Sequence, residues 1–206
     1  MKTKKFLFYL LAVILGGCIP SLNSLFTENE LIFEEKLLGT WAEDDSRETW
    51  QFKRGSDDPN EKFYEMSYTN SDGEGLFFAG LGKINDMMFL NIFPHEPELD
   101  KTNDFYKFHI LRVNTFIKIE QIEPTLKMAV MNPDTIKEML EKDPNIIKHE
   151  IIEDGDRILL TASTQQLQQF MKEHANDEGL FGDPSELKRL TPKDPNDADN
   201  IETNDS

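Results

Sequence analysis

The chain has 206 residues, of which 39 are acidic and 22 are basic, so its net charge is −17 at pH 7. An acidic surplus of this size repels nucleic acid and anionic lipid headgroups, and we expect no nucleic-acid partner. The single cysteine excludes disulfides within the chain, and the length is that of one domain with short appendages.

The first residues have the pattern of a secretion signal. Residues 1–5 contain three lysines and no acid, and residues 6–15 are ten uncharged, apolar residues. A helix that spans a bilayer needs about 20 apolar residues, so this run is too short to be one. Two glycines follow the run and precede Cys18. We therefore expect residues 1–17 to be a signal peptide that is removed.

The sequence Leu15-Gly16-Gly17-Cys18 resembles the lipobox of bacterial lipoproteins, in which an aliphatic residue and two small residues precede a cysteine. The resemblance implies that Cys18 becomes the N-terminal residue and carries lipid, which attaches the protein to a membrane. In such lipoproteins of Gram-negative bacteria, an aspartate after the cysteine favours the inner membrane. Ile19 stands there instead, which implies an outer-membrane lipoprotein of the cell envelope. The alternative is an ordinary signal followed by an incidental cysteine.

The remainder of the chain divides into three parts by composition. Without residues 1–17 it has 189 residues with 19 basic and 39 acidic side chains, a net charge of −20, so membrane attachment would depend on the lipid. We expect residues 18–30 to be a tether and residues 31–190 to be the folded domain. Residues 191–206 are rich in Asp, Asn and Pro, and we expect a disordered acidic tail there.

Alternation of apolar and polar residues predicts β-strands through the first two-thirds of the domain. The strands are expected at residues 37–41, 49–53, 64–68, 76–84, 87–93, 106–110, 117–119 and 126–130. Successive short strands indicate an antiparallel meander, and closure into a barrel removes its unpaired edges. Gly75, Gly80 and Gly82 suit strongly bent strands. We therefore expect a mainly β fold, an up-and-down barrel of about eight strands.

The last third of the domain predicts two helices, a late hairpin and a closing strand. Asn132 and Pro133 form a helix start before apolar residues spaced by three and four. Residues 147–151 and 157–162 indicate a hairpin around Asp154-Gly155. Residues 163–174 form the second helix, with a capping box at its start. Residues 186–190 are expected to return to the barrel as its last strand.

The tetrapeptide LGTW at residues 38–41 resembles the opening of lipocalin-like, calycin-type domains. The resemblance implies that Gly39 allows a close bend and that Trp41 closes the barrel floor. It also implies that a basic residue near the end of the domain packs on the tryptophan, through a cation–π contact of about 0.5–2 kcal/mol. We assign that role to Arg189, with Lys188 as the alternative register. The later stretch, through KDPNIIKHE, DRILLTAS and LFGDPSELKRL, also resembles uncharacterised bacterial proteins with lipocalin-like domains, which implies a fold and no activity.

An eight-stranded barrel either fills with its own side chains or holds one small ligand. The aromatic and methionine side chains expected to line a ligand site are Tyr64, Met66, Tyr68, Phe89, Phe108 and Met128. Two functions follow. The first is a lipid-anchored barrel that binds a small apolar ligand or lipid, and the second is a non-catalytic lipoprotein with a filled core that docks on an envelope protein.

Neither function requires catalysis, and the sequence indicates none. It contains no Gly-x-Ser-x-Gly element, and its four histidines do not share metal-ligand spacing. Cys18 is used by the anchor, which excludes it as a nucleophile. We therefore expect no enzyme activity, no metal and no cofactor.

Overall fold

The computed structural model describes residues 18–55, 61–96, 103–152 and 157–190. The expected signal peptide at residues 1–17, the acidic tail at residues 191–206 and the turn at Asp154-Gly155 lie outside the described residues. Within the described parts, the chain is mainly β, with three α-helices and a separate two-stranded sheet.

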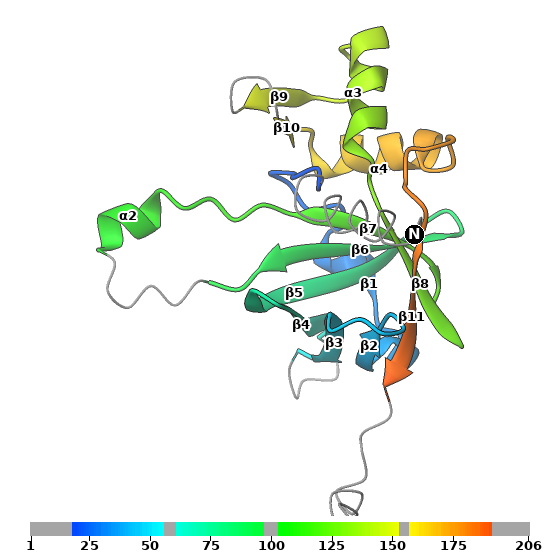
Figure 1. Cartoon of the computed structure of the whole chain (residues 1–206). Helices are drawn as coiled ribbons and strands as arrows, with labels where there is room; N and C mark the ends of the chain where they lie inside the picture. The colour runs from blue at the N-terminus through cyan, green and yellow to red at the C-terminus, as the bar shows by residue number, and fades with distance from the viewer. Residues whose placement is uncertain (1–17, 56–60, 97–102, 153–156, 191–206) are drawn as a thin grey trace, which may run out of the picture.

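Eight antiparallel strands form a closed barrel (Figure 1). They are β2 (Gly39–Ala42), β3 (Thr49–Arg54), β4 (Phe63–Asn70), β5 (Gly73–Ile84), β6 (Met87–Pro94), β7 (Thr115–Gln121), β8 (Thr125–Val130) and β11 (Ser185–Leu190). Strands β2 to β8 each pair with the next in sequence, and β11 pairs with both β8 and β2. The predicted up-and-down barrel is confirmed, and closure leaves its strands paired on both sides.

The pairing register gives every barrel strand one inward and one outward face. Trp41 of β2 lies opposite Trp50 of β3, and Phe52 of β3 lies opposite Met66 of β4. These side chains belong to, or pack against, a cluster of buried apolar residues inside the barrel. Their neighbours along each strand point outward, as a side-chain period of two requires.

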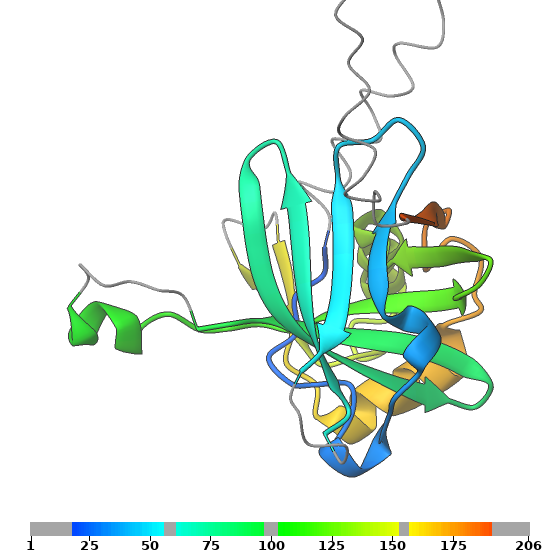
Figure 2. The same ribbon diagram turned by 90° about the horizontal axis from the view of Figure 1, so that it is seen from below.

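The prediction of a strand at residues 106–110 is wrong. The segment forms the short helix α2 (Asp104–Phe108), and the Asn103 side chain accepts a hydrogen bond of 2.8 Å from the Tyr106 amide at its start. β6 already pairs directly with β7, so the barrel has no place for another strand between them. Figures 1 and 2 both show α2 standing well away from the barrel.

A second layer covers one side of the barrel. It consists of α3 (Pro133–Lys142), α4 (Thr164–His174) and a hairpin of β9 (His149–Ile152) and β10 (Arg157–Leu160), all between β8 and β11 in sequence. Asn132 caps α3, and Ser163 and Gln166 form the capping box of α4, so the two predicted helices and the hairpin are confirmed. Figure 1 places this layer above β6 and β7.

The layer and the barrel share a second apolar core, outside the first. Phe89 of β6 and Phe116 of β7 contribute outward-facing side chains, and Leu167, Phe170 and Met171 of α4 meet them. The barrel wall is therefore buried on both of its faces here, which explains why β6 is apolar at almost every position.

The tether expected at residues 18–30 is instead part of this outer core. Ile19, Leu25 and Phe26 are 3%, 0% and 5% exposed. The Ser21 amide donates to the Asn114 carbonyl at 2.9 Å, and the Leu22 amide donates to the Leu160 carbonyl at 2.9 Å. Apolar side chains and backbone pairing thus hold this segment, which we call the N-terminal segment, against the barrel.

Short elements connect the N-terminal segment to the barrel. They are the 3₁₀ turn η1 (Glu28–Glu30), strand β1 (Leu31–Ile32) and the 3₁₀ turn η2 (Glu35–Leu37). β1 pairs with the far end of β5, with Leu31 opposite Gly82.

Two glycines of β5, Gly80 and Gly82, leave room for this docking, a role beyond the strand bending that the sequence predicts. A Cβ on Gly82 would lie 2.6 Å from ring atoms of Phe26, and one on Gly80 would lie 2.8 Å from Cδ2 of Leu31. Both distances are shorter than a carbon–carbon contact allows. The bare backbone of β5 therefore permits the N-terminal segment to lie directly on the barrel wall.

We expect Gly82→Ala to displace Phe26 and to lower the free energy of unfolding by about 1–3 kcal/mol, as overpacking does. Hydrogen exchange should become faster across residues 19–30 and stay unchanged in β2 and β3. Gly182→Ala is the matched control, because its Cβ would meet nothing closer than the Val130 carbonyl at 4.0 Å. Equal exchange in the two variants would contradict the docking role of Gly82.

Candidate functional site: the barrel and its docked N-terminus

Large side chains of the chain itself fill the barrel interior. Those less than 2% exposed include Trp41, Phe52, Tyr64, Leu81, Leu90 and Leu126. A cavity that admits a ligand would leave the side chains around it accessible to a water-sized sphere. Near-zero exposure therefore means that these side chains contact other atoms on all sides, as in an ordinary protein core.

Four of the six side chains expected to line a ligand site do face the interior. Tyr64, Met66 and Met128 are buried in the inner cluster, and Tyr68 packs against it. Each is therefore part of the packed core.

The other two expected lining residues lie elsewhere. Phe89 points outward into the second core and lies 5.9 Å from the Phe181 ring between centroids. Its neighbour Leu90 takes the inward position. Phe108 belongs to α2, outside the barrel, and its side chain lies outside the described parts of the structure.

The two interior tyrosines use their hydroxyl groups within the fold. The Tyr64 hydroxyl accepts from the Glu34 amide at 2.6 Å and donates to the Glu34 carbonyl at 3.1 Å. The Tyr68 hydroxyl donates to Oε2 of Glu48 at 2.8 Å. Burial raises the pKa of each tyrosine to about 12. Both tyrosine hydroxyl groups therefore make their hydrogen bonds within the protein.

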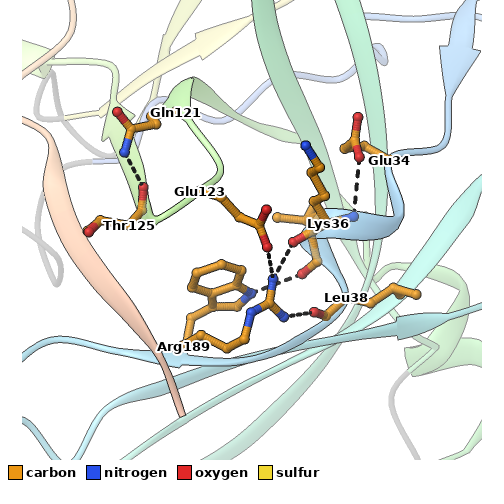
Figure 3. A network of polar contacts seen from close by, with 9 residues as sticks. Glu34, Lys36, Leu38, Gln121, Glu123, Thr125 and Arg189 are labelled. Carbon is orange, nitrogen blue, oxygen red and sulfur yellow. Dashed lines mark hydrogen bonds and ion pairs between the residues drawn. The ribbon is translucent and has the colours of Figure 1, made fainter. Parts of the chain in front are cut away.

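Arg189 of β11 packs on Trp41 of β2 at one end of the barrel, and Figure 3 shows the polar contacts that Arg189 makes there. The guanidinium carbon lies 4.2 Å from the centre of the indole ring. Nη2 donates to the Lys36 carbonyl at 2.6 Å and lies 3.2 Å from Oε1 of Glu123, and Nη1 donates to the Leu38 carbonyl. The structure thus brings together the two residues assigned to the floor, and Arg189 links β11 to η2 and to the turn after β7.

The remaining details of this end fit the same arrangement. Gly39 has a φ of +121°, and a Cβ there would lie 2.6 Å from Nη1 of Arg189, so the position requires glycine on two grounds. The Trp41 indole donates to the Leu37 carbonyl at 2.9 Å. Lys188, the alternative register, is exposed and pairs with Asp44 instead. The contacts of a single charged side chain, Arg189, thus close this end of the barrel.

We expect Arg189→Met to lower the free energy of unfolding by about 1–3 kcal/mol, because two backbone carbonyls lose a charged donor and the indole loses a cation. Lys188→Met is the matched control on the same strand, and loss of its exposed ion pair with Asp44 should leave the free energy of unfolding nearly unchanged. Urea denaturation measures both. An equal loss in the two variants would show that Arg189 contributes only surface charge.

A depression of about 410 Å³ lies outside the barrel. Phe26 and Leu31 of the N-terminal part, Phe63 and Phe93 of the barrel and Arg112 of the segment after α2 contribute to its walls. It is open to solvent and of mixed polarity. The depression therefore differs from the enclosed apolar pocket that a lipocalin-type ligand site requires.

The histidines of the described residues lie apart from one another and have separate partners. No group of three or more potential metal ligands forms among these residues. His95 stacks on Phe78 with ring centres 3.8 Å apart, and Nδ1 of His174 lies 2.8 Å from Asp177. His174 is thus paired with an acid, whereas Nε2 of His95 is buried without a hydrogen-bond partner in the part of the chain that the structure describes.

Cys18 stands at the start of the docked N-terminal segment and is exposed. Three residues later, Ser21 is fixed to Asn114 by backbone hydrogen bonds in both directions, of 2.9 and 2.8 Å. These bonds define the position of Cys18 relative to the barrel.

Across the described residues, no helix has the length and apolar character needed to cross a membrane.

Comparison with protein-family models, curated proteins and solved structures finds no match to this chain. The closed eight-stranded architecture is compatible with a calycin-like fold. Function must therefore be argued from the residues themselves.

Proposed function

We propose that this chain is a lipid-anchored lipoprotein of the bacterial cell envelope, whose barrel is a solid, non-catalytic scaffold for interaction at the membrane surface. The packed interior carries this proposal, because Trp41, Phe52, Tyr64 and the other large side chains at its centre are less than 2% exposed. Carriage of a small apolar ligand or lipid would require these side chains to repack. The solid-core function is therefore favoured over ligand carriage.

The anchor rests on residues 15–18 and on the place of Cys18 in the fold. The apolar run and the two glycines provide the cleavable leader that lipid attachment needs, and Cys18 provides the only thiol of the chain. Because the mature chain would carry a charge of −20, acyl chains rather than surface charge would hold it to the membrane. Ile19 after the cysteine favours the outer membrane of a Gram-negative bacterium.

Metabolic labelling with a palmitate analogue tests the anchor. The wild-type chain should incorporate the label and partition with membranes, and Cys18→Ala should do neither, because the acceptor sulfur is gone. Cys18→Ala also keeps the exposed position small, so its barrel should fold normally. Equal labelling of both chains, or a secreted protein that begins at another residue, would refute the anchor.

Native mass spectrometry tests the solid core. The purified protein, mixed with a panel of fatty acids, should retain its apo mass, because the chain's own large side chains fill the centre of the barrel. A 1:1 complex that Met66→Trp abolishes would instead establish ligand carriage inside the barrel. Leu190→Trp is the matched control, since this exposed side chain lies outside the inner cluster.

A further inference from the structure

We propose that residues 103–114, which we call the arm, form a second contact with the membrane. In this arrangement the aromatic and aliphatic side chains of the arm lie in the interface of the bilayer that holds the acyl chains of Cys18. The inference rests on the proposed function, because the arm acts together with the lipid anchor.

The arm exposes an unusual share of large apolar side chains. Of the eight that are exposed among the described residues, four lie here: Phe105, Tyr106, Ile110 and Leu111, with 77%, 59%, 40% and 67% of their surface accessible. Figures 1 and 2 show α2, which carries Phe105 and Tyr106, projecting beyond the barrel. A cluster of this kind on a projecting segment is typical of a binding surface.

The charge of the arm differs from that of the rest of the chain. It contains one acidic residue, Asp104, and two basic residues, Lys107 and Arg112, in a mature chain where acidic residues outnumber basic ones two to one. Lys107 lies 3.7 Å from Asp104, and Arg112 lines the depression beside the barrel. Basic residues interleaved with aromatic and aliphatic ones suit the headgroup region of an anionic bilayer.

The root of the arm is joined to the segment that carries the anchor. The Asn114 amide donates to the Ser21 carbonyl at 2.8 Å, and the Ser21 amide returns a bond to the Asn114 carbonyl. Asn91, which is buried, donates through Nδ2 to Oδ1 of Asn114 at 2.9 Å and accepts from the Leu25 amide at 2.8 Å. One buried amide thus fixes the arm and the N-terminal segment to the same point of β6.

This junction limits the distance between anchor and arm. The three residues from Cys18 to Ser21 span at most about 10 Å, so the acyl chains enter the bilayer close to the root of the arm. The lipid thereby keeps the arm at high local concentration next to the membrane, and a few interfacial side chains suffice for a contact that would be weak alone. The expected result is a barrel with one orientation on the membrane.

A nitroxide label on the arm tests the proposal in the full chain. In the lipidated protein the Cys18 sulfur is blocked, so Tyr106→Cys supplies the sole free thiol. The protein is reconstituted in vesicles of phosphatidylethanolamine and phosphatidylglycerol, and the same label on the unlipidated Cys18→Ser chain in solution is the reference. Leu190→Cys is the matched control, because Leu190 is also exposed and apolar but lies on β11.

We expect collisions of the Tyr106→Cys label with a water-soluble nickel chelate to fall by about threefold or more on the vesicles, while collisions with oxygen rise, as for a side chain at interfacial depth. The Leu190→Cys label should change little. Adding Phe105→Ser and Leu111→Ser should return the Tyr106→Cys label to water, while the protein still floats with the vesicles.

Three results would overturn the inference, and each has a different meaning. Flotation with a water-exposed label at position 106 would show that the anchor holds and the arm does not touch the membrane. Loss of nickel access that grows with protein concentration in the unlipidated chain would assign the arm to contact with a second copy or another protein. Failure of the wild-type chain to acquire lipid would refute the anchor and the arm together.

Discussion

The closure of the barrel by β11 is the constraint on which the other features depend. This strand pairs with β8 on one side and β2 on the other, although about 50 residues separate it from β8. Those residues have no place in the barrel and form the outer layer instead. The same pairing sets Arg189 opposite Trp41, where its guanidinium reaches the carbonyls that end η2. Sheet closure, the sealed floor and the second core are thus consequences of one strand.

Much of this architecture was predictable from the sequence, because side-chain period and helix caps are local signals. The alternation around Tyr64 and Met66 is strict, and Ser163 with Gln166 marks a helix start. Which residues of β6 face the barrel interior was not predictable, because residues 87–93 are apolar on both faces of the strand and alternation cannot distinguish them. Phe89 was placed inside for that reason, while the outer layer buries it.

Two other features depend on tertiary contacts that short segments do not reveal. Residues 106–110 alternate like a strand, yet β6 and β7 pair with each other and leave the segment to helix α2. The N-terminal segment has too few apolar residues to show any period, and its burial depends on the bare backbone of Gly82 and on Asn91. For the candidate site, the floor contact between Trp41 and Arg189 followed from a resemblance, whereas the filled interior required the packing itself.

If Cys18 carries the proposed lipid, the docked N-terminal segment also determines how far this protein can act from the membrane. A domain on a long flexible linker samples a wide volume. Here, backbone hydrogen bonds already hold the chain against the barrel at Ser21. A lipid at Cys18 would hold the barrel flush with the bilayer, so its range of action would be its own diameter. Molecules that it meets would have to be embedded in, or recruited to, the same leaflet.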